Sequence, residues 1–107
     1  MEAINNAESQ ILSIPTPYEL TAVSELISTQ CIDLQKAYEQ ASTEGIHEKT
    51  NELHQAVSMC HQEVIAYAKQ TCPIKFNELT HCLQQSNNSL NACQNLLNEF
   101  NSCLKNL

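Results

Sequence analysis

The sequence predicts an all-α fold of two sequential antiparallel helical hairpins stapled by disulfides. Glycine occurs once in 107 residues, and the abundant residues are the helix formers Ala, Leu, Glu and Gln together with Asn, so the tight turns that sheets need are scarce. Apolar residues recur with the period of a helix, without sustained strand alternation. Six cysteines in so short a chain indicate a disulfide framework, which supplements the modest core that a single small domain can bury.

The first helix has a clear start signal. Residues 1–15 are polar and acidic, and we expect them to form an extended N-terminal arm. Thr16 can cap a helix, Pro17 suits the first helical position, and Glu19 completes a capping box. We therefore predict one helix over 17–41.

The remaining boundaries follow from turn residues and from the third proline. A proline disfavours helical backbone in the residue before it, so Cys72 is expected to cap a third helix in front of Pro73. The predicted elements are a turn over 42–45 that contains Gly45, a second helix over 46–70, a third helix ending at 85, a turn over 86–89 with Ser89 as a cap, and a fourth helix over 90–105.

The spacing of the last four cysteines predicts their pairing. Nine residues separate Cys72 from Cys82, and nine separate Cys93 from Cys103. Ten residues of helix advance about 15 Å and rotate by roughly 1000°, so both cysteines of a pair lie on one face. Antiparallel packing about a turn at Asn87 then predicts the disulfides Cys72–Cys103 and Cys82–Cys93. The apolar residues expected between the two helices are Phe76, Leu79, Leu96, Leu97 and Phe100.

The first half of the chain carries a weaker version of the same pattern. Ten residues after Cys31 stands Ala41, and ten residues before Cys60 stands Thr50. If a second hairpin turns at Gly45, Cys31 pairs with Cys60, and Ala41 faces Thr50 where a second disulfide would lie. We therefore divide the chain into the arm over 1–15, a degenerate first hairpin over 16–71 and a complete hairpin over 72–107.

Composition bears on compartment and partners. The net charge is −7 and arginine is absent, so a nucleic acid partner is not expected. No apolar run reaches the roughly 20 residues of a transmembrane helix. Disulfides require an oxidising compartment, yet the N-terminus lacks the basic and apolar regions of a secretory signal. We expect the mitochondrial intermembrane space. A secreted chain whose signal has been removed is the alternative, and the sequon at Asn87 would suit it, although Met1 argues against it.

Residues 72–82 (CPIKFNELTHC) and 93–103 (CQNLLNEFNSC) resemble the CHCH (coiled-coil-helix-coiled-coil-helix) family of the twin C-x9-C class. Eleven residues separate Cys72 from Cys60, which ends a further hairpin. This tandem is similar to the double-CHCH accessory subunits of mitochondrial respiratory complex I, the PGIV family. The stretch from Ile14 to Leu20 is also similar to the N-terminal arm of that family. Ala41 and Thr50 stand where the family has cysteines.

The resemblance implies a structural accessory subunit of complex I (NADH:ubiquinone oxidoreductase) in the respiratory chain. It would lie on the intermembrane-space face, peripheral to the inner membrane, and would stabilise the membrane arm without taking part in electron transport. Its partners would be other subunits of the complex and, during import, the disulfide relay, onto which Phe76 could dock. The alternatives are an intermembrane-space assembly factor and an accessory subunit of another respiratory complex.

Catalytic and metal-binding readings find little support in the sequence. The Cys60-His61 and His81-Cys82 pairs could suggest zinc, but their cysteines have helical spacing suited to disulfides, so we interpret both histidines as helix-surface residues. Neither a C-x-x-C motif nor a phosphate-binding loop is present. We expect no enzyme activity, no cofactor and no metal. Met59 and Tyr67 are interpreted as packing residues.

Overall fold

Six helices and no strand make up residues 14–106, the part of the chain that the computed structural model describes. The all-α prediction of disulfide-stapled hairpins is confirmed. All but the last two residues of the predicted N-terminal arm lie outside the described residues. The helices are α2 (Pro17–Ala22), α3 (Ser24–Gln30), α4 (Ile32–Glu44), α5 (His47–Thr71), α6 (Pro73–Gln85) and α7 (Gln94–Lys105).

The capping box at the start of α2 forms as predicted. The backbone N–H of Glu19 donates to the Thr16 hydroxyl over 3.1 Å, and the backbone N–H of Thr16 donates to the Glu19 carboxylate over 2.9 Å. Pro17 occupies the first turn, where its missing N–H costs no hydrogen bond. This local pattern fixes where α2 begins.

The single helix predicted over 17–41 is wrong, because the chain bends twice within it. Val23 separates α2 from α3, and Cys31 separates α3 from α4, with φ of −107° and −108°. Both residues are 1 % exposed. Neither bend contains glycine or proline. The bends are therefore tertiary in origin, since they turn Val23 and Cys31 into the core.

Both hairpin turns close with the same backbone motif. Gly45 follows α4 with φ of 74°, and the N–H of Ile46 donates to the carbonyl of Ala41. Asn87 follows α6 with φ of 55°, and the N–H of Asn88 donates to the carbonyl of Leu83. A left-handed residue combined with this hydrogen bond across five residues is the Schellman ending of a helix. Glycine and asparagine are the residues that adopt it most readily.

The fourth helix starts later than predicted. Residues 90–93 form turns, and α7 begins at Gln94 instead of 90. Ser89 does accept a hydrogen bond, from the N–H of Ala92 over 3.4 Å, but this bond stabilises the turn before the helix. The chain reverses direction through Asn87 and Asn88, which both have left-handed conformations. It then forms further turns up to Cys93 before α7 packs on α6.

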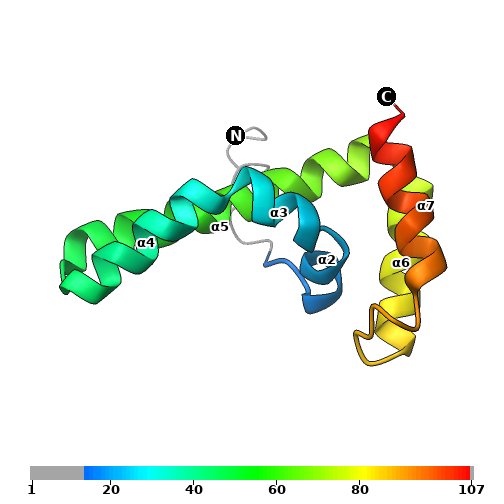
Figure 1. Cartoon of the computed structure of the whole chain (residues 1–107), viewed down its shortest axis with the longest axis horizontal. Helices are drawn as coiled ribbons and strands as arrows, with labels where there is room; N and C mark the ends of the chain where they lie inside the picture. The colour runs from blue at the N-terminus through cyan, green and yellow to red at the C-terminus, as the bar shows by residue number, and fades with distance from the viewer. Residues whose placement is uncertain (1–13, 107) are drawn as a thin grey trace, which may run out of the picture.

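The two hairpins meet at an angle, and α2 and α3 fill it. Figure 1 shows α4 lying antiparallel along one end of α5, with the α6–α7 hairpin crossing the other end. The short helix α2 contacts both α5 and α6, and α3 contacts α5. One continuous core joins α2, α3, the second half of α5, α6 and α7, whereas Ala41 of α4 and Val57 of α5 are buried outside it. Its buried members are Ala22, Val23, Cys31, Val64, Ile65, Ala68, Cys72, Phe76, Leu79, Leu83, Cys93 and Phe100.

Candidate interaction surface and disulfide framework

Three disulfides join the helices, and they are the three that the hairpin register predicts. Their Cα atoms lie 6.0 to 6.3 Å apart, within the usual range for a disulfide. Cys31–Cys60 ties the start of α4 to the middle of α5. The α6–α7 hairpin carries the other two, Cys72–Cys103 at its open end and Cys82–Cys93 beside its turn. The framework therefore fixes both hairpins covalently.

Each disulfide joins one buried cysteine at a helix junction to one half-buried cysteine within a helix. The junction cysteine is the N-cap residue of α4, α6 or α7 and has non-helical backbone angles. The junction cysteines are Cys31, Cys72 and Cys93, at 1 %, 3 % and 2 % exposure, and their half-buried partners are Cys60, Cys103 and Cys82. The covalent links thus lie where helices start, and only one sulfur of each pair comes near the surface.

An aromatic contact supports the α6–α7 hairpin between its two disulfides. The ring centroids of Phe76 and Phe100 lie 5.9 Å apart at a tilt of 55°, within the favourable range for aromatic pairs. Both side chains are almost fully buried, at 2 % and 0 % exposure. The predicted role of Phe76 in the hairpin core is confirmed, whereas its docking role stays a prediction.

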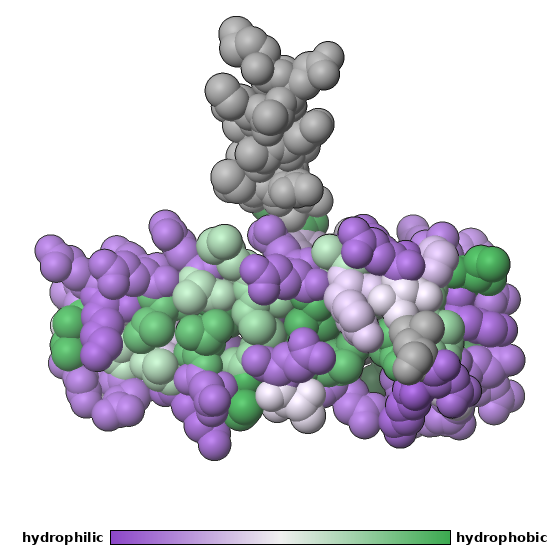
Figure 2. All heavy atoms as spheres, turned by 90° about the horizontal axis from the view of Figure 1, so that it is seen from above, coloured by the Kyte–Doolittle hydropathy of each residue, from purple (hydrophilic) through white to green (hydrophobic). Residues whose placement is uncertain are grey.

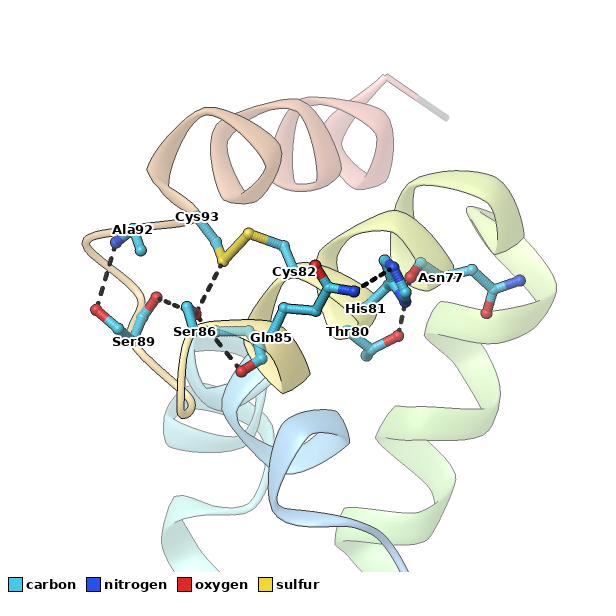
Figure 3. The surroundings of a disulfide bond; sticks show 10 residues. Asn77, Thr80, His81, Cys82, Gln85, Ser86, Ser89, Ala92 and Cys93 are labelled. Atoms are coloured by element: carbon cyan, nitrogen blue, oxygen red, sulfur yellow. Dashed lines mark hydrogen bonds between the residues drawn. A yellow bond between two sulfur atoms is a disulfide. The ribbon is translucent and has the colours of Figure 1, made fainter.

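The turn-side disulfide has a polar neighbour. Figure 3 shows the hydroxyl of Ser86 beside Cys93, with its Oγ 3.5 Å from the Cys93 Sγ. The same Oγ lies 3.5 Å from the carbonyl oxygens of Leu83 and Ser89. A hollow of about 370 Å³ opens at this bond; its lining residues are Cys82, Asn91, Ala92, Cys93, Gln94, Asn95 and Leu96.

One face of α5 carries exposed apolar side chains. Val57, Val64, Ile65 and Ala68 form its buried stripe, and at 100° per residue Met59 lies on the opposite side. Met59 is 59 % exposed and Tyr67 is 46 % exposed. The interpretation of these two as packing residues is therefore wrong, because no other described helix covers that side of α5. The buried stripe itself is the sequence signal that places Met59 outside.

The exposed face of α5 is also acidic. Glu48, Glu52 and Glu63 are exposed and lie within about 40° of Met59 around the helix, whereas the two lysines of α5 lie about 80° to either side. We call Glu48, Glu52, Met59 and Glu63, together with Tyr67 at the edge about 80° from Met59, the outer face of α5. Beside it, a hollow of about 470 Å³ is lined by Gln30, Cys60, Glu63, Val64 and Tyr67.

Apolar side chains also reach the surface elsewhere. Figure 2 shows them as a band along one long side of the molecule, between hydrophilic borders. Ile74 is the most exposed large apolar residue of the six helices, at 72 %.

The histidines do not assemble with other ligands. His61 is half-buried, and burial lowers the pKa of its ring. His81 is exposed and lies 3.2 Å from the Gln85 amide. The cysteines next to both are in disulfides. Between residues 14 and 106, no three His, Cys, Asp or Glu side chains gather as a metal site would require. In the same region no helix is long and apolar enough to cross a membrane.

No family model, curated protein or solved structure matches the chain. The small all-helical fold with its three disulfides is compatible with a CHCH-like fold.

Proposed function

We propose that this chain is a structural accessory subunit of mitochondrial complex I on the intermembrane-space face. One observation carries the proposal, namely two consecutive helical hairpins that are each tied by disulfides. The second hairpin holds both disulfides ten residues apart, and the first keeps one of them, Cys31–Cys60. This tandem arrangement is the feature that resembles the double-CHCH accessory subunits.

The shape of the molecule suits a binding role. Disulfides fix both hairpins, and α2 and α3 hold them in one orientation. A rigid body loses little conformational entropy on association, so a modest surface can bind well. The outer face of α5, with Met59 and Tyr67 exposed among glutamates, is the proposed contact with neighbouring subunits. We propose that the protein acts by clamping these neighbours, without chemistry of its own.

The proposed location follows from the disulfides. Three disulfides and no free cysteine among the described residues suit an oxidising compartment. In the intermembrane space, the disulfide relay would form these bonds during import and thereby trap the chain. The folded protein would then lie peripherally on the inner membrane, held by contacts with other subunits.

Blue-native electrophoresis of solubilised mitochondria from cells that express the tagged chain tests this proposal. We expect the chain to migrate with NADH:ubiquinone oxidoreductase activity, and depletion to reduce the amount of assembled complex. Migration with another respiratory complex would assign it there instead. Migration only with partly assembled intermediates would indicate an assembly factor, and release into the culture medium with a glycan on Asn87 would indicate a secreted protein.

A surface variant tests the outer face of α5 directly. Met59→Glu places a charge at an exposed apolar position and should remove the chain from the assembled complex while leaving its thermal unfolding unchanged. Asn77→Glu is the matched control, since it adds the same charge at an exposed position of α6. Equal migration of both variants with the complex would exclude this face as the contact.

A further inference from the structure

We propose that Cys82–Cys93 is a thiol-exchange site, at which a low-molecular-weight thiol forms a mixed disulfide with Cys82. The inference is independent of the proposed function. It rests on three features of the surroundings of this disulfide. These are the hollow beside it, the charge along the approach and the stabilisation of the leaving sulfur.

Each bond has one half-buried sulfur, but the surroundings of the bonds differ. The hollow at Cys82–Cys93 is lined by both of its cysteines, and the hollow beside α5 is lined by Cys60 but not by Cys31. Neither of these two hollows is lined by Cys72 or Cys103. A thiolate must approach one sulfur from the side opposite its partner. Cys93 is 2 % exposed, whereas Cys82 is half-buried, so the attack falls on Cys82.

Charge along the approach favours the same bond. The attacking species is an anionic thiolate. The hollow at Cys60 includes the exposed carboxylate of Glu63, which repels an anion. The hollow at Cys82 is lined by no charged side chain, and it includes Gln94, Asn95 and Leu96, the first residues of α7. The backbone N–H groups at a helix start lack intrahelical acceptors and favour an anion. Glu78, one helical turn before Cys82, forms an ion pair with Lys75 over 3.4 Å. Lys75 therefore offsets the repulsion that the Glu78 carboxylate would exert on an approaching thiolate.

The leaving sulfur is stabilised at Cys93. All three junction cysteines are N-cap residues, so the helix start does not distinguish them. Ser86 does, because its Oγ lies 3.5 Å from the Cys93 Sγ. The single proton of that hydroxyl has three possible acceptors, namely the carbonyl oxygens of Leu83 and Ser89 and the Cys93 sulfur. In the closed disulfide the neutral sulfur is the weakest of them. A thiolate on Cys93 is a strong acceptor, so the Ser86 hydroxyl would donate its hydrogen bond to that sulfur.

The exchange step is balanced and reversible. The external thiolate sulfur bonds to the Cys82 Sγ, the Cys82–Cys93 bond breaks, and its electron pair leaves with the Cys93 Sγ. The product is a mixed disulfide on Cys82 and a thiolate on Cys93. Attack by Cys93 on the mixed disulfide expels the external thiolate and restores the original bond. Cys72–Cys103 and the Phe76–Phe100 contact continue to hold α6 against α7, so the opened form stays folded.

Limited reduction of the oxidised full-length protein by glutathione tests the proposal. Free thiols are alkylated at intervals, and chymotryptic peptides, cut after Leu83 and Leu90, are identified by tandem mass spectrometry. We expect Cys82–Cys93 to open about tenfold faster than either other bond, with glutathione on Cys82 and the alkyl group on Cys93. Opening of Cys31–Cys60 or Cys72–Cys103 first, or glutathione on Cys93, would overturn the proposal.

Two variants of Ser86 test the role of its hydroxyl. Ser86→Ala should slow the opening of Cys82–Cys93 about fivefold, since a charge-assisted hydrogen bond is lost. Ser86→Thr keeps a hydroxyl and should retain most of the rate, so it controls for altered folding. Ser102→Ala, at an exposed position of α7, should leave the rate unchanged. Equal rates in Ser86→Ala and in the unmodified protein would exclude the hydroxyl as the stabilising group.

Discussion

Glu19 and Lys69 form an ion pair of 2.8 Å that joins the start of α2 to the last turns of α5. The other carboxylate oxygen of Glu19 accepts the backbone N–H of Thr16. One side chain thus caps α2 and attaches it to α5, beside the junction at Cys72. Burial alone would raise the pKa of Glu19, but Lys69 and the hydrogen bonds with Thr16 together hold it below the ordinary value of 4.5.

This pKa shift predicts a loss of stability in acid. A carboxyl group whose pKa is lowered by folding stabilises the protein fully above its ordinary pKa and loses that contribution as the pH falls through the lowered value. Glu19→Gln keeps a capping side chain but removes the charge, so at neutral pH it should cost about 0.5–1 kcal/mol, as expected for a partly exposed pair. Below pH 4.5, the difference from the unmodified protein should shrink.

Urea denaturation at several pH values, followed by circular dichroism, measures this difference. Glu52→Gln serves as the control, because Glu52 is an exposed residue of α5 and its loss should have little effect. A pH-independent difference for Glu19→Gln would show that the ion pair contributes nothing.

A fourth disulfide should form in the first hairpin. Ala41 and Thr50 each lie ten residues from Cys31 and Cys60, on the turn side, as Cys82 and Cys93 do relative to Cys72 and Cys103. The double variant Ala41→Cys/Thr50→Cys should therefore close a bond and add about 2–3 kcal/mol of stability on the chain-entropy model. Non-reducing peptide mapping and thermal unfolding measure the two effects.

The single variants Ala41→Cys and Thr50→Cys are the controls for this design. Each should leave one free thiol and give no gain in stability. A double variant with two free thiols would show that the register of the first hairpin departs from that of the second.

Two neighbouring positions of α6 should respond oppositely to truncation. Phe76 is 2 % exposed and contacts Phe100, whereas Ile74 is 72 % exposed. Phe76→Ala should lower the free energy of unfolding by about 3–5 kcal/mol, through lost burial and the cavity it leaves. Ile74→Ala should change it by less than about 0.5 kcal/mol. Calorimetry with all disulfides oxidised compares them, and similar losses would contradict the packing described for this hairpin.

The success of sequence-based prediction depended on how local each signal was. The capping box at Thr16, the chain reversal at Gly45 and the disulfide register are fixed by residues close in sequence or by helical spacing, and these predictions are confirmed. The rest of the predicted turn over 42–45 is wrong, because α4 continues to Glu44. The bends at Val23 and Cys31 have no local signal, because they arise from packing against α5 and α6.

The exposure of Met59 shows a further limit of the sequence. Its helix has an evident apolar stripe, but only the three-dimensional structure shows that nothing described covers the opposite face. The ion pair of Glu19 with Lys69 likewise joins residues 50 positions apart, and no spacing rule connects them.

Gly45 should be the most sensitive position of the first hairpin turn. Its φ of 74° is left-handed, a conformation that costs residues with a Cβ roughly 1–2 kcal/mol. An added Cβ would meet no atom within 4 Å, so the cost of Gly45→Ala comes from the backbone alone and should be about 1 kcal/mol. Gly45→Asn should cost less, because asparagine tolerates this conformation, as Asn87 does in the second turn. Chemical denaturation ranks the variants, with hydrogen exchange at the end of α4 reporting the local effect. Equal losses for alanine and asparagine would show that the backbone conformation of Gly45 does not limit the stability of this turn.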